Sequence, residues 1–264
     1  MPDTSQKQLP RMHFVSNYIQ SPLHPVTVTL IGAGGNGSQM LSALGRINIA
    51  LKSLGHPGLH VTVWDPDTVE KPNIGRQLFT WSELGMNKAT ALVSRFNRFY
   101  GTGWDAVPEK FNLTGLPRNI IITCVDNVKA RLEVSKLFND KSNNNKYTGE
   151  EYKNYYWLDL GNAQNTGQAI LGSQKIQQPK TKKFEVVDTL PSLDKEVNLK
   201  KIKESDSGPS CSMAEALEKQ DLFINSTLVQ LAGSLLWSLF RDIAIDIRGF
   251  YINLETMKTN PIKI

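Results

Sequence analysis

Short apolar runs alternate with helical periodicities along the first half of the chain. Residues 26–31 (VTVTLI), 59–64 (LHVTVW) and 119–125 (NIIITCV) have the length and the β-branched or alternating character of strands. Apolar residues recur at helical spacing over residues 39–54, and residues 88–99 are predicted to form a second helix. A strand, helix, strand, helix, strand order predicts a Rossmann-like α/β fold with a doubly wound, mostly parallel sheet.

The second half of the chain predicts strands that turn back on themselves. Residues 155–160 and 168–171 flank a turn rich in Gly and Asn, and residues 250–254 and 260–264 indicate a closing hairpin. Antiparallel C-terminal strands are therefore expected to complete the mostly parallel sheet. Residues 212–247 resume a helical pattern, whose apolar stripe is interpreted as core by default and as a subunit interface in the alternative.

One domain preceded by an arm is the predicted organisation. Residues 1–25 are polar and interrupted by proline, which predicts an arm outside the core, and residues 26–264 are expected to form a single domain. Residues 139–153 have almost nothing to bury and are predicted to be a mobile loop. Residues 175–210 show no sustained period, so we expect a long crossing segment there.

Composition narrows the class of protein. The chain has 264 residues, 40% hydrophobic and 21% charged, which excludes fibrous and disordered chains. Its net charge of +5 permits a nucleic-acid partner without demanding one. Two cysteines exclude a disulfide framework and a zinc site of four cysteines within one chain. With no signal segment and no apolar stretch of about 20 residues, a cytoplasmic protein without a membrane partner is expected.

Candidate chemistry begins at the turn GAGGNG, which follows the first strand and precedes the first helix. Its glycines Gly32, Gly34, Gly35 and Gly37 let the backbone approach a phosphate while the helix N-terminus presents N–H donors. The motif predicts a bound nucleotide, with a purely structural tight turn as the alternative. Asp65 ends the next strand, where a carboxylate can accept hydrogen bonds from ribose hydroxyls.

Two cations and two amides follow Asp65 along the chain. They are Asn73, Arg76, Gln77 and Lys88. Cations that converge on one end of a nucleotide match the charge of its β and γ phosphates. A hydride-transfer site needs no such cluster, so triphosphate binding is favoured over a nicotinamide dinucleotide. A solvated basic face is the alternative, but it leaves the two amides unexplained.

Asp126 directly follows the strand at residues 119–125, at the carboxyl edge where α/β sheets bind ligands. Its carboxylate is a candidate to hold Mg²⁺ against a triphosphate, and the alternative is an N-cap of the helix that begins near Val128. The four histidines, all within residues 13–60, are expected to be structural or exposed. Cys124 lies in an apolar strand and is assigned to the core.

Taken in order, these motifs resemble the adenylating domain of the ubiquitin-activating enzyme and ThiF/MoeB superfamily. They are GAGGNGS, DPD at residues 65–67, NIGRQ at residues 73–77, Lys88 and VDN at residues 125–127. The resemblance implies the fold of ubiquitin-like-activating enzymes. It implies that the glycine turn with Asp65 and Asp67 holds ATP, that Asn73, Arg76, Gln77 and Lys88 contact the triphosphate, and that Asp126 binds Mg²⁺.

The reaction implied by the resemblance is attack of a carboxylate, usually a protein C-terminus ending in glycine, on the α-phosphorus of ATP. A carboxylate is already anionic at neutral pH, so positioning and charge neutralisation of pyrophosphate supply most of the barrier reduction. Arg76, Lys88 and Asp126 are the residues to which the resemblance assigns this work. A general base, and hence a catalytic histidine, is not required.

The resemblance extends to the region of Cys211. The run PSCS at residues 209–212 is similar to the crossover that carries the thioester cysteine in several ubiquitin-activating enzymes, and a following helix would lower the thiol pKa. An unreactive residue is the alternative, because some relatives manage without such a cysteine. The paired CxxC motifs of many relatives are absent from this sequence, so no structural zinc is expected.

Partners are likewise implied by the resemblance. Residues 208–225 are most similar to the ThiF-related proteins of PRTRC cassettes, which implies a small ubiquitin-like protein as substrate. Family members generally dimerise through the C-terminal half, and Arg11 is a candidate to enter the partner protomer's ATP site. Three alternatives stay open: adenylation of a carboxylate on tRNA, as in threonylcarbamoyladenosine dehydratases; a nicotinamide-dependent oxidoreductase; and a nucleotide-binding scaffold without activity.

Overall fold

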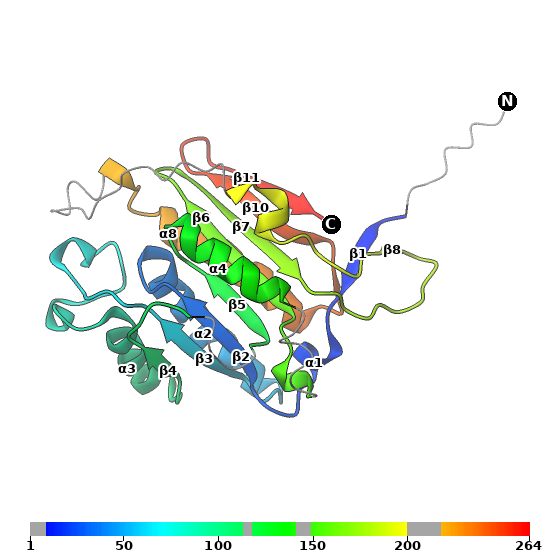
Figure 1. Ribbon diagram of the computed structural model, residues 1–264, viewed down its shortest axis with the longest axis horizontal. Coiled ribbons are helices and arrows are strands. Elements are labelled where there is room, and N and C mark those ends of the chain that lie inside the picture. The colour runs from blue at the N-terminus through cyan, green and yellow to red at the C-terminus, as the bar shows by residue number, and fades with distance from the viewer. Residues whose placement is uncertain (1–8, 113–117, 141–148, 200–217) are drawn as a thin grey trace.

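A mostly parallel sheet lies at the centre of the molecule (Figure 1). The computed structural model describes residues 9–112, 118–140, 149–199 and 218–264, and over these residues the sheet has eight strands in the order β11-β10-β7-β6-β5-β2-β3-β4. They are β2 (Val26–Ile31), β3 (Leu59–Trp64), β4 (Asp105–Val107), β5 (Ile120–Thr123), β6 (Tyr156–Asn162), β7 (Thr166–Ser173), β10 (Ile247–Asn253) and β11 (Lys258–Lys263). Neighbours from β4 to β6 are parallel, and neighbours from β6 to β11 are antiparallel. The predicted fold class is confirmed.

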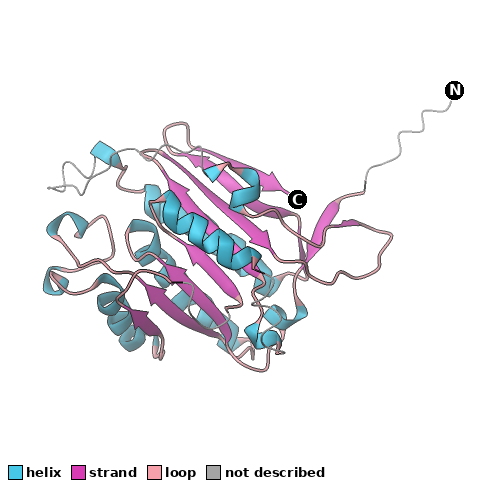
Figure 2. Cartoon of the chain, in the orientation of Figure 1, coloured by secondary structure: helices cyan, strands magenta, loops and turns pink. Residues whose placement is uncertain are grey.

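Helices cover both faces of this sheet (Figures 1 and 2). On one face lie α2 (Gly35–Ser53), α3 (Lys88–Tyr100) and α8 (Ile224–Arg241), and on the other lie α4 (Val128–Asn139) and α6 (Leu193–Glu196). Because both faces are covered, a central strand buries successive residues, and Ile120, Ile121 and Ile122 of β5 are all fully buried. This burial explains why the sequence of the strand is a continuous apolar run.

The last helix is shorter than the sequence pattern predicts. α8 begins at Ile224, ends at Arg241 and is followed by β9 (Ala244–Ile245), so the predicted helix over residues 212–247 is interrupted at residues 220–223 and is wrong beyond residue 241. Isoleucines alternate with other residues at 243, 245 and 247, which is the period of a strand and not of a helix. Residues 212–217 of the predicted helix lie outside the described residues.

The N-terminal arm is joined to the core. Its residues form β1 (Arg11–Phe14), which lies between β8 (Glu185–Val186) and β9 in a second small sheet, and α1 (Asn17–Gln20). The side chains of Val15 and Ile19 belong to the main hydrophobic cluster. The prediction of an arm outside the core is therefore wrong for residues 11–20, because strand pairing and the burial of two side chains outweigh their polar composition.

The crossing segment shares the small sheet with the arm. Its described part, residues 175–199, contributes β8 and then α6. Residues 200–210 of this segment and residues 141–148 of the predicted mobile loop lie outside the described residues. In the part of the chain that the structure describes, no helix combines the length and the apolar character needed to cross a bilayer.

His13 of β1 is a buried histidine that connects the arm to the core. Its side chain is fully buried, with Nδ1 2.7 Å from the carbonyl oxygen of Val187 and Nε2 3.1 Å from the hydroxyl of Tyr156. Burial disfavours the imidazolium form and lowers the pKa of His13 from its ordinary value of 6.5. The neutral imidazole is therefore the form that fits the folded protein.

The free energy of unfolding should fall as the pH decreases below 6.5, because the unfolded chain then takes up a proton at His13 that the folded chain resists. His13→Gln keeps a donor and an acceptor but cannot titrate, so it should lose this part of the pH dependence. Urea denaturation from about pH 7.5 to about pH 5 measures the effect. The exposed His24→Gln is the control and should follow the wild type. Identical pH dependence in His13→Gln and the wild type contradicts the prediction.

Candidate functional site

The carboxyl ends of β2 and β5 form the switch point of the sheet. After β2 the chain continues through α2 to β3 on one side, whereas β5 pairs with β2 on the other side. Open α/β sheets bind ligands in the crevice outside the carboxyl ends of the strands at such a point. The turn GAGGNG lies at the end of β2, and Asp126 follows the end of β5. The topology therefore brings both to the same edge of the sheet.

Two glycines of this turn occupy positions where a side chain has no room. Gly32 has a φ of 92°, and a Cβ built on it would lie 2.7 Å from the carbonyl oxygen of Cys124. A Cβ on Gly37 would lie 1.8 Å from the carbonyl oxygen of Gly32. α2 begins at Gly35, earlier than the predicted residue 39. The first N–H groups of a helix lack intrahelical partners, so this end of α2 is suited to bind an anion.

Asp65 joins the glycine turn to the end of β3. Its side chain is buried, with Oδ2 accepting a hydrogen bond from the N–H of Ala33 at 2.5 Å and Oδ1 accepting one from the N–H of Asp67 at 2.9 Å. Burial raises the pKa of Asp65, and the two backbone donors oppose this rise. Lys88 Nζ lies 3.2 Å from Asp67 Oδ2. The structure thus groups these two carboxylates and Lys88 beside the turn.

Arg76 is half-buried, and a neutral side chain holds its guanidinium. Nη1 donates a hydrogen bond to Gln220 Oε1 at 2.5 Å, and Nε is buried without a hydrogen-bond partner. No ion pair formed within the described residues includes Arg76. Burial lowers the pKa of Arg76. A desolvated guanidinium without a counter-charge favours an anionic ligand.

The contacts of Gln220 place Arg76 next to the glycine turn. Gln220 Oε1 also lies 3.5 Å from Asn225 Nδ2, at the start of α8. The Asn225 side chain packs on Gly35, where a Cβ would lie 2.6 Å from Nδ2. Arg76 is therefore connected to the turn through two amide side chains that the sequence analysis did not identify.

Gln77 lies against the turn, whereas Asn73 shapes the loop that carries it. Nε2 of Gln77 is 4.0 Å from the position that a Cβ on Gly34 would take, and Oε1 is buried without a partner. Asn73 Oδ1 accepts a hydrogen bond from the N–H of Glu70 at 2.9 Å, and its backbone oxygen accepts one from the N–H of Gln77 at 2.9 Å. Asn73 thus positions Gln77 through the backbone.

Asp126 is exposed beyond the end of β5. The N-cap of α4 is Asn127, whose Oδ1 accepts a hydrogen bond from the N–H of Ala130 at 2.8 Å, so the alternative assignment of Asp126 as the cap is wrong. In the described part of the chain, no hydrogen bond or ion pair joins Asp126 to Arg76 or Lys88. Nor do the described residues include three His, Cys, Asp or Glu side chains grouped to hold a metal ion.

Cysteine and histidine side chains add no second reactive centre in the described residues. Cys124 packs against the core, and burial raises the pKa of its thiol, in line with its assignment to the core. Cys211 lies outside the described residues. The histidines are structural or exposed as predicted: His13 is buried, His56 contacts a backbone oxygen, His60 pairs with Asp105, and His24 is exposed.

The family profile of ThiF matches residues 6–236 of the chain. The chain belongs to the ThiF family. Its curated relatives include the ubiquitin-like modifier-activating enzyme 5 of Drosophila erecta, 25% identical over 158 residues, and that of Aedes aegypti, 26% identical over 155 residues. Each match covers 52% of this chain and 36% of the relative, so the chain matches about a third of the relatives' length.

Solved structures share the fold of this ThiF family chain. A structure of E. coli MccB with MccA-N7isoASN has a TM-score of 0.57 at 13% identity and covers 93% of this chain and 66% of MccB. PaaA has a TM-score of 0.55 at 14% identity, with 90% of this chain and 64% of PaaA covered. The family match and the common fold confirm the predicted membership of the ThiF/MoeB/E1-like superfamily.

A buried ion pair behind Asp126 was missed by the sequence analysis. Arg131 Nε of α4 lies 3.0 Å from Asp159 Oδ1 of β6, and the same oxygen accepts a hydrogen bond from Thr123 Oγ1 at 2.5 Å. Asp159 is 1% exposed. This contact fixes the start of α4 to β6 and so fixes the segment that carries Asp126. A carboxylate within the apolar strand YYWLDL is the signal that could have revealed it.

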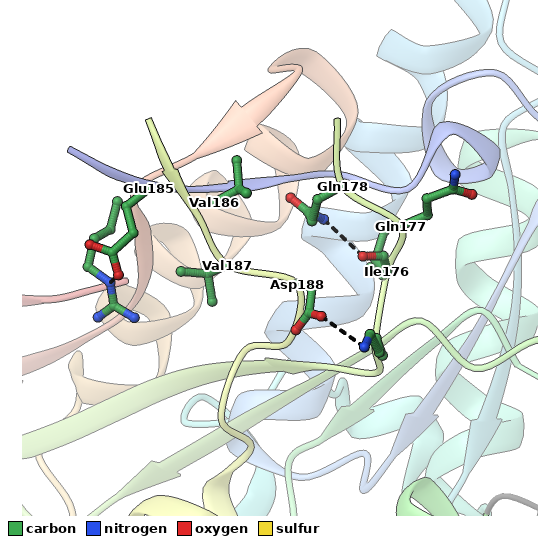
Figure 3. A pocket seen from close by; sticks show the side chains of 9 residues that line it. Ile176, Gln177, Gln178, Glu185, Val186, Val187 and Asp188 are labelled. Carbon is green, nitrogen blue, oxygen red and sulfur yellow. Dashed lines mark hydrogen bonds and ion pairs between the residues drawn. The ribbon is translucent and has the colours of Figure 1, made fainter. Parts of the chain in front are cut away.

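A pocket of about 630 Å³ lies away from the glycine turn, at β1 and β8 (Figure 3). Its rim carries two ion pairs, Arg11 Nε to Glu185 Oε1 at 3.2 Å and Lys175 Nζ to Asp188 Oδ2 at 3.3 Å. Of the residues that the sequence assigned to a site, Arg11 alone is among its lining residues. Arg11 is thus paired within its own chain here, and its entry into a partner's site stays a prediction.

Proposed function

We propose that this ThiF family protein uses ATP to adenylate the C-terminal carboxylate of a ubiquitin-like protein. The observation that carries the proposal is a glycine turn suited to an anion beside Arg76, a half-buried cation held by an amide. Family membership and the similarity to ubiquitin-like modifier-activating enzyme 5 support the same reaction. The partner, the activity and the oligomeric state, for which we propose a homodimer, are parts of this proposal.

The residues around the turn fit ATP. The N–H groups at the start of α2 are donors for phosphate oxygens, and the guanidinium of Arg76 lacks an anion. Each oxygen of Asp65 accepts one backbone donor and retains a lone pair for a ribose hydroxyl. Lys88, whose ion-pair partner Asp67 is largely exposed, supplies a second cation for the triphosphate.

In the proposed reaction an oxygen of the acceptor carboxylate forms a bond to the α-phosphorus of ATP. The bond between that phosphorus and the oxygen bridging to the β-phosphate breaks, and pyrophosphate leaves with the electron pair. Arg76 and Lys88 neutralise the charge that develops on pyrophosphate, and the α2 N-terminus orients the α-phosphate. The nucleophile needs no deprotonation, which agrees with the positions of the histidines away from the turn.

Asp126 is the residue we propose to hold Mg²⁺. A single exposed carboxylate beside a phosphate site fits this ion, because Mg²⁺ is usually held by one or two carboxylates together with substrate phosphates. The described residues offer no all-protein cage, and none is required for this mode of binding. When bound there, Mg²⁺ would supply positive charge to the triphosphate.

The proposal is tested by acceptor-dependent exchange of labelled pyrophosphate into ATP, with a ubiquitin-like protein ending in glycine. We expect Arg76→Ala, Lys88→Ala and Asp126→Ala each to lower the exchange rate by about 100-fold or more, because each removes charge stabilisation from the transition state. Arg98→Ala, an exposed arginine on the same helix as Lys88, is the matched control.

Three outcomes of the exchange assay contradict the proposal in different ways. The absence of exchange with every acceptor contradicts the proposed adenylation activity. If exchange responds to tRNA and not to protein, and depends steeply on salt, the acceptor is tRNA and not a ubiquitin-like protein. Equal exchange and equal ATP binding in Asp126→Ala and the wild type removes the magnesium assignment.

Gln220→Glu should raise the KM for ATP about tenfold, because its carboxylate would pair with Arg76 and compete with the triphosphate. Gln220→Ala removes the same amide without adding a charge and should change KM by less than about threefold. Added salt should reduce the difference between the two variants. If both variants have the same KM, the triphosphate does not contact Arg76.

Cys211, which lies outside the described residues, is proposed to form a thioester with the adenylated acceptor. The thiolate would attack the acyl carbon and AMP would leave. We expect an adduct of the protein and the acceptor on non-reducing gels that dithiothreitol removes and that Cys211→Ser lacks. Cys124→Ala should still form it. An adduct that persists in Cys211→Ser excludes this role for Cys211.

A further inference from the structure

The glycine turn contains an asparagine whose side chain is not fully paired. Asn36 is the second residue of α2, and its side chain is buried at 7% exposure. Nδ2 donates a hydrogen bond to Asn162 Oδ1, at the end of β6, at 2.8 Å. Oδ1 of Asn36 is buried and has no hydrogen-bond partner. A buried acceptor that lacks a donor is costly and calls for a functional explanation.

The orientation of this amide follows from its neighbour. Asn162 Nδ2 donates to the carbonyl oxygen of Ala163 at 3.1 Å, which leaves Asn162 Oδ1 to face Asn36 as an acceptor. Asn36 must therefore present Nδ2 to Asn162, and its own Oδ1 remains the atom that needs a donor. Asn162 is half-exposed and Ala163 is exposed, so this corner of the site borders solvent.

Asn36 is joined to the side of the site opposite Asp65, the residue proposed to bind the ribose. Asp65, the candidate for the ribose, ends β3 on one side of β2, whereas Asn162 ends β6 on the other side of β2, beyond β5. Asn36 itself lies between Gly35 and Gly37, whose N–H groups we assign to phosphate. The side of β5 and β6 is therefore left for the second substrate.

Covalent geometry limits how far the last peptide bond of the acceptor can lie from the α-phosphorus. The attacking carboxylate oxygen must come within about 3.5 Å of the α-phosphorus. The last peptide bond of the acceptor is one Cα further away, and consecutive Cα atoms are about 3.8 Å apart. Its N–H is the nearest donor that a peptide acceptor carries into the site, because the terminal carboxylate has none.

Resting on the proposed function, we propose that Asn36, oriented by Asn162, recognises the last peptide bond of the acceptor. Asn36 Oδ1 accepts a hydrogen bond from the N–H of that peptide bond. The substrate class is a peptide C-terminus whose final residue has a backbone N–H, which excludes acceptors that end in proline. Asn36 contacts the substrate and determines specificity, and Asn162 is the positioning residue. Neither residue reacts with ATP.

The experiment compares two forms of one ubiquitin-like acceptor in the pyrophosphate exchange assay. One form ends in glycine, and the other, made by semisynthesis, ends in glycolate, so that an ester oxygen replaces the last N–H. The wild type should use the glycolate form with a kcat/KM about tenfold lower, the loss expected for one buried hydrogen bond. In Asn36→Leu the two forms should be used equally.

Two further variants keep the result independent of the folding of Asn36→Leu. Asn162→Ala leaves the glycine turn intact and frees the Asn36 amide, so the preference for glycine should fall to about threefold. Asn165→Ala, in the same turn between β6 and β7, is the matched control and should keep the full preference. The KM for ATP, measured in parallel, separates the acceptor side from the nucleotide side.

Each result either supports the inference or overturns it. A tenfold preference that Asn36→Leu or Asn162→Ala reduces supports it. The same preference in every variant, or none in the wild type, overturns it while the exchange itself sustains the proposed function. Exchange with neither form overturns the inference and the proposed acceptor together.

Discussion

The carbonyl oxygen of Gly32 lies where the side chain of any other residue at position 37 would have to be. A Cβ on Gly37 would be 1.8 Å from that oxygen, and one on Gly32 would be 2.7 Å from the carbonyl oxygen of Cys124, the residue that follows β5. This contact lets α2 begin within the turn that ends β2, so that its N-terminus opens at the switch point of the sheet. The other features of the candidate site depend on this contact, because Asp65 and Asn225 are arranged around the turn it creates.

Three of the six buried side-chain atoms that lack a hydrogen-bond partner in the described residues lie around the same turn. Arg76 Nε, Gln77 Oε1 and Asn36 Oδ1 are all buried and unpaired, and each such group costs about 1–3 kcal/mol of stability. A chain selected for stability alone would replace them with apolar residues. Their presence is understood if a charged ligand and a peptide supply the missing partners, so that binding energy offsets a cost carried by the empty fold. Stability and recognition are in this way opposed at one place in the molecule.

Local sequence patterns were enough to predict most strands of the sheet. They could not predict contacts between residues that lie far apart in the sequence. β2 and β3 were predicted because each is an apolar run of strand length, and the glycine turn because close approach demands glycine. The partner of Arg76 could not be predicted, since Gln220 follows it by 144 residues and carries no motif. The arm was misjudged for a similar reason: Val15 and Ile19 are too few to give a pattern, yet both reach the core.

Residues 218–221 connect the two sides of the crevice. Gln220 holds Arg76 on the side that we propose for the triphosphate. The side-chain amide of Gln164 donates to the carbonyl oxygen of Glu218 at 2.9 Å, and the backbone oxygen of Gln164 accepts from the N–H of Asp221 at 3.0 Å. Gln164 lies in the turn that begins beyond Asn162, on the side that we propose for the acceptor. An anion that binds Arg76 in place of Gln220 would remove one of the contacts of this segment. A ligand can shift a structure only through contacts that differ between its states. This exchange of partners at Arg76 would therefore couple the site that we propose for the triphosphate to the one that we propose for the acceptor.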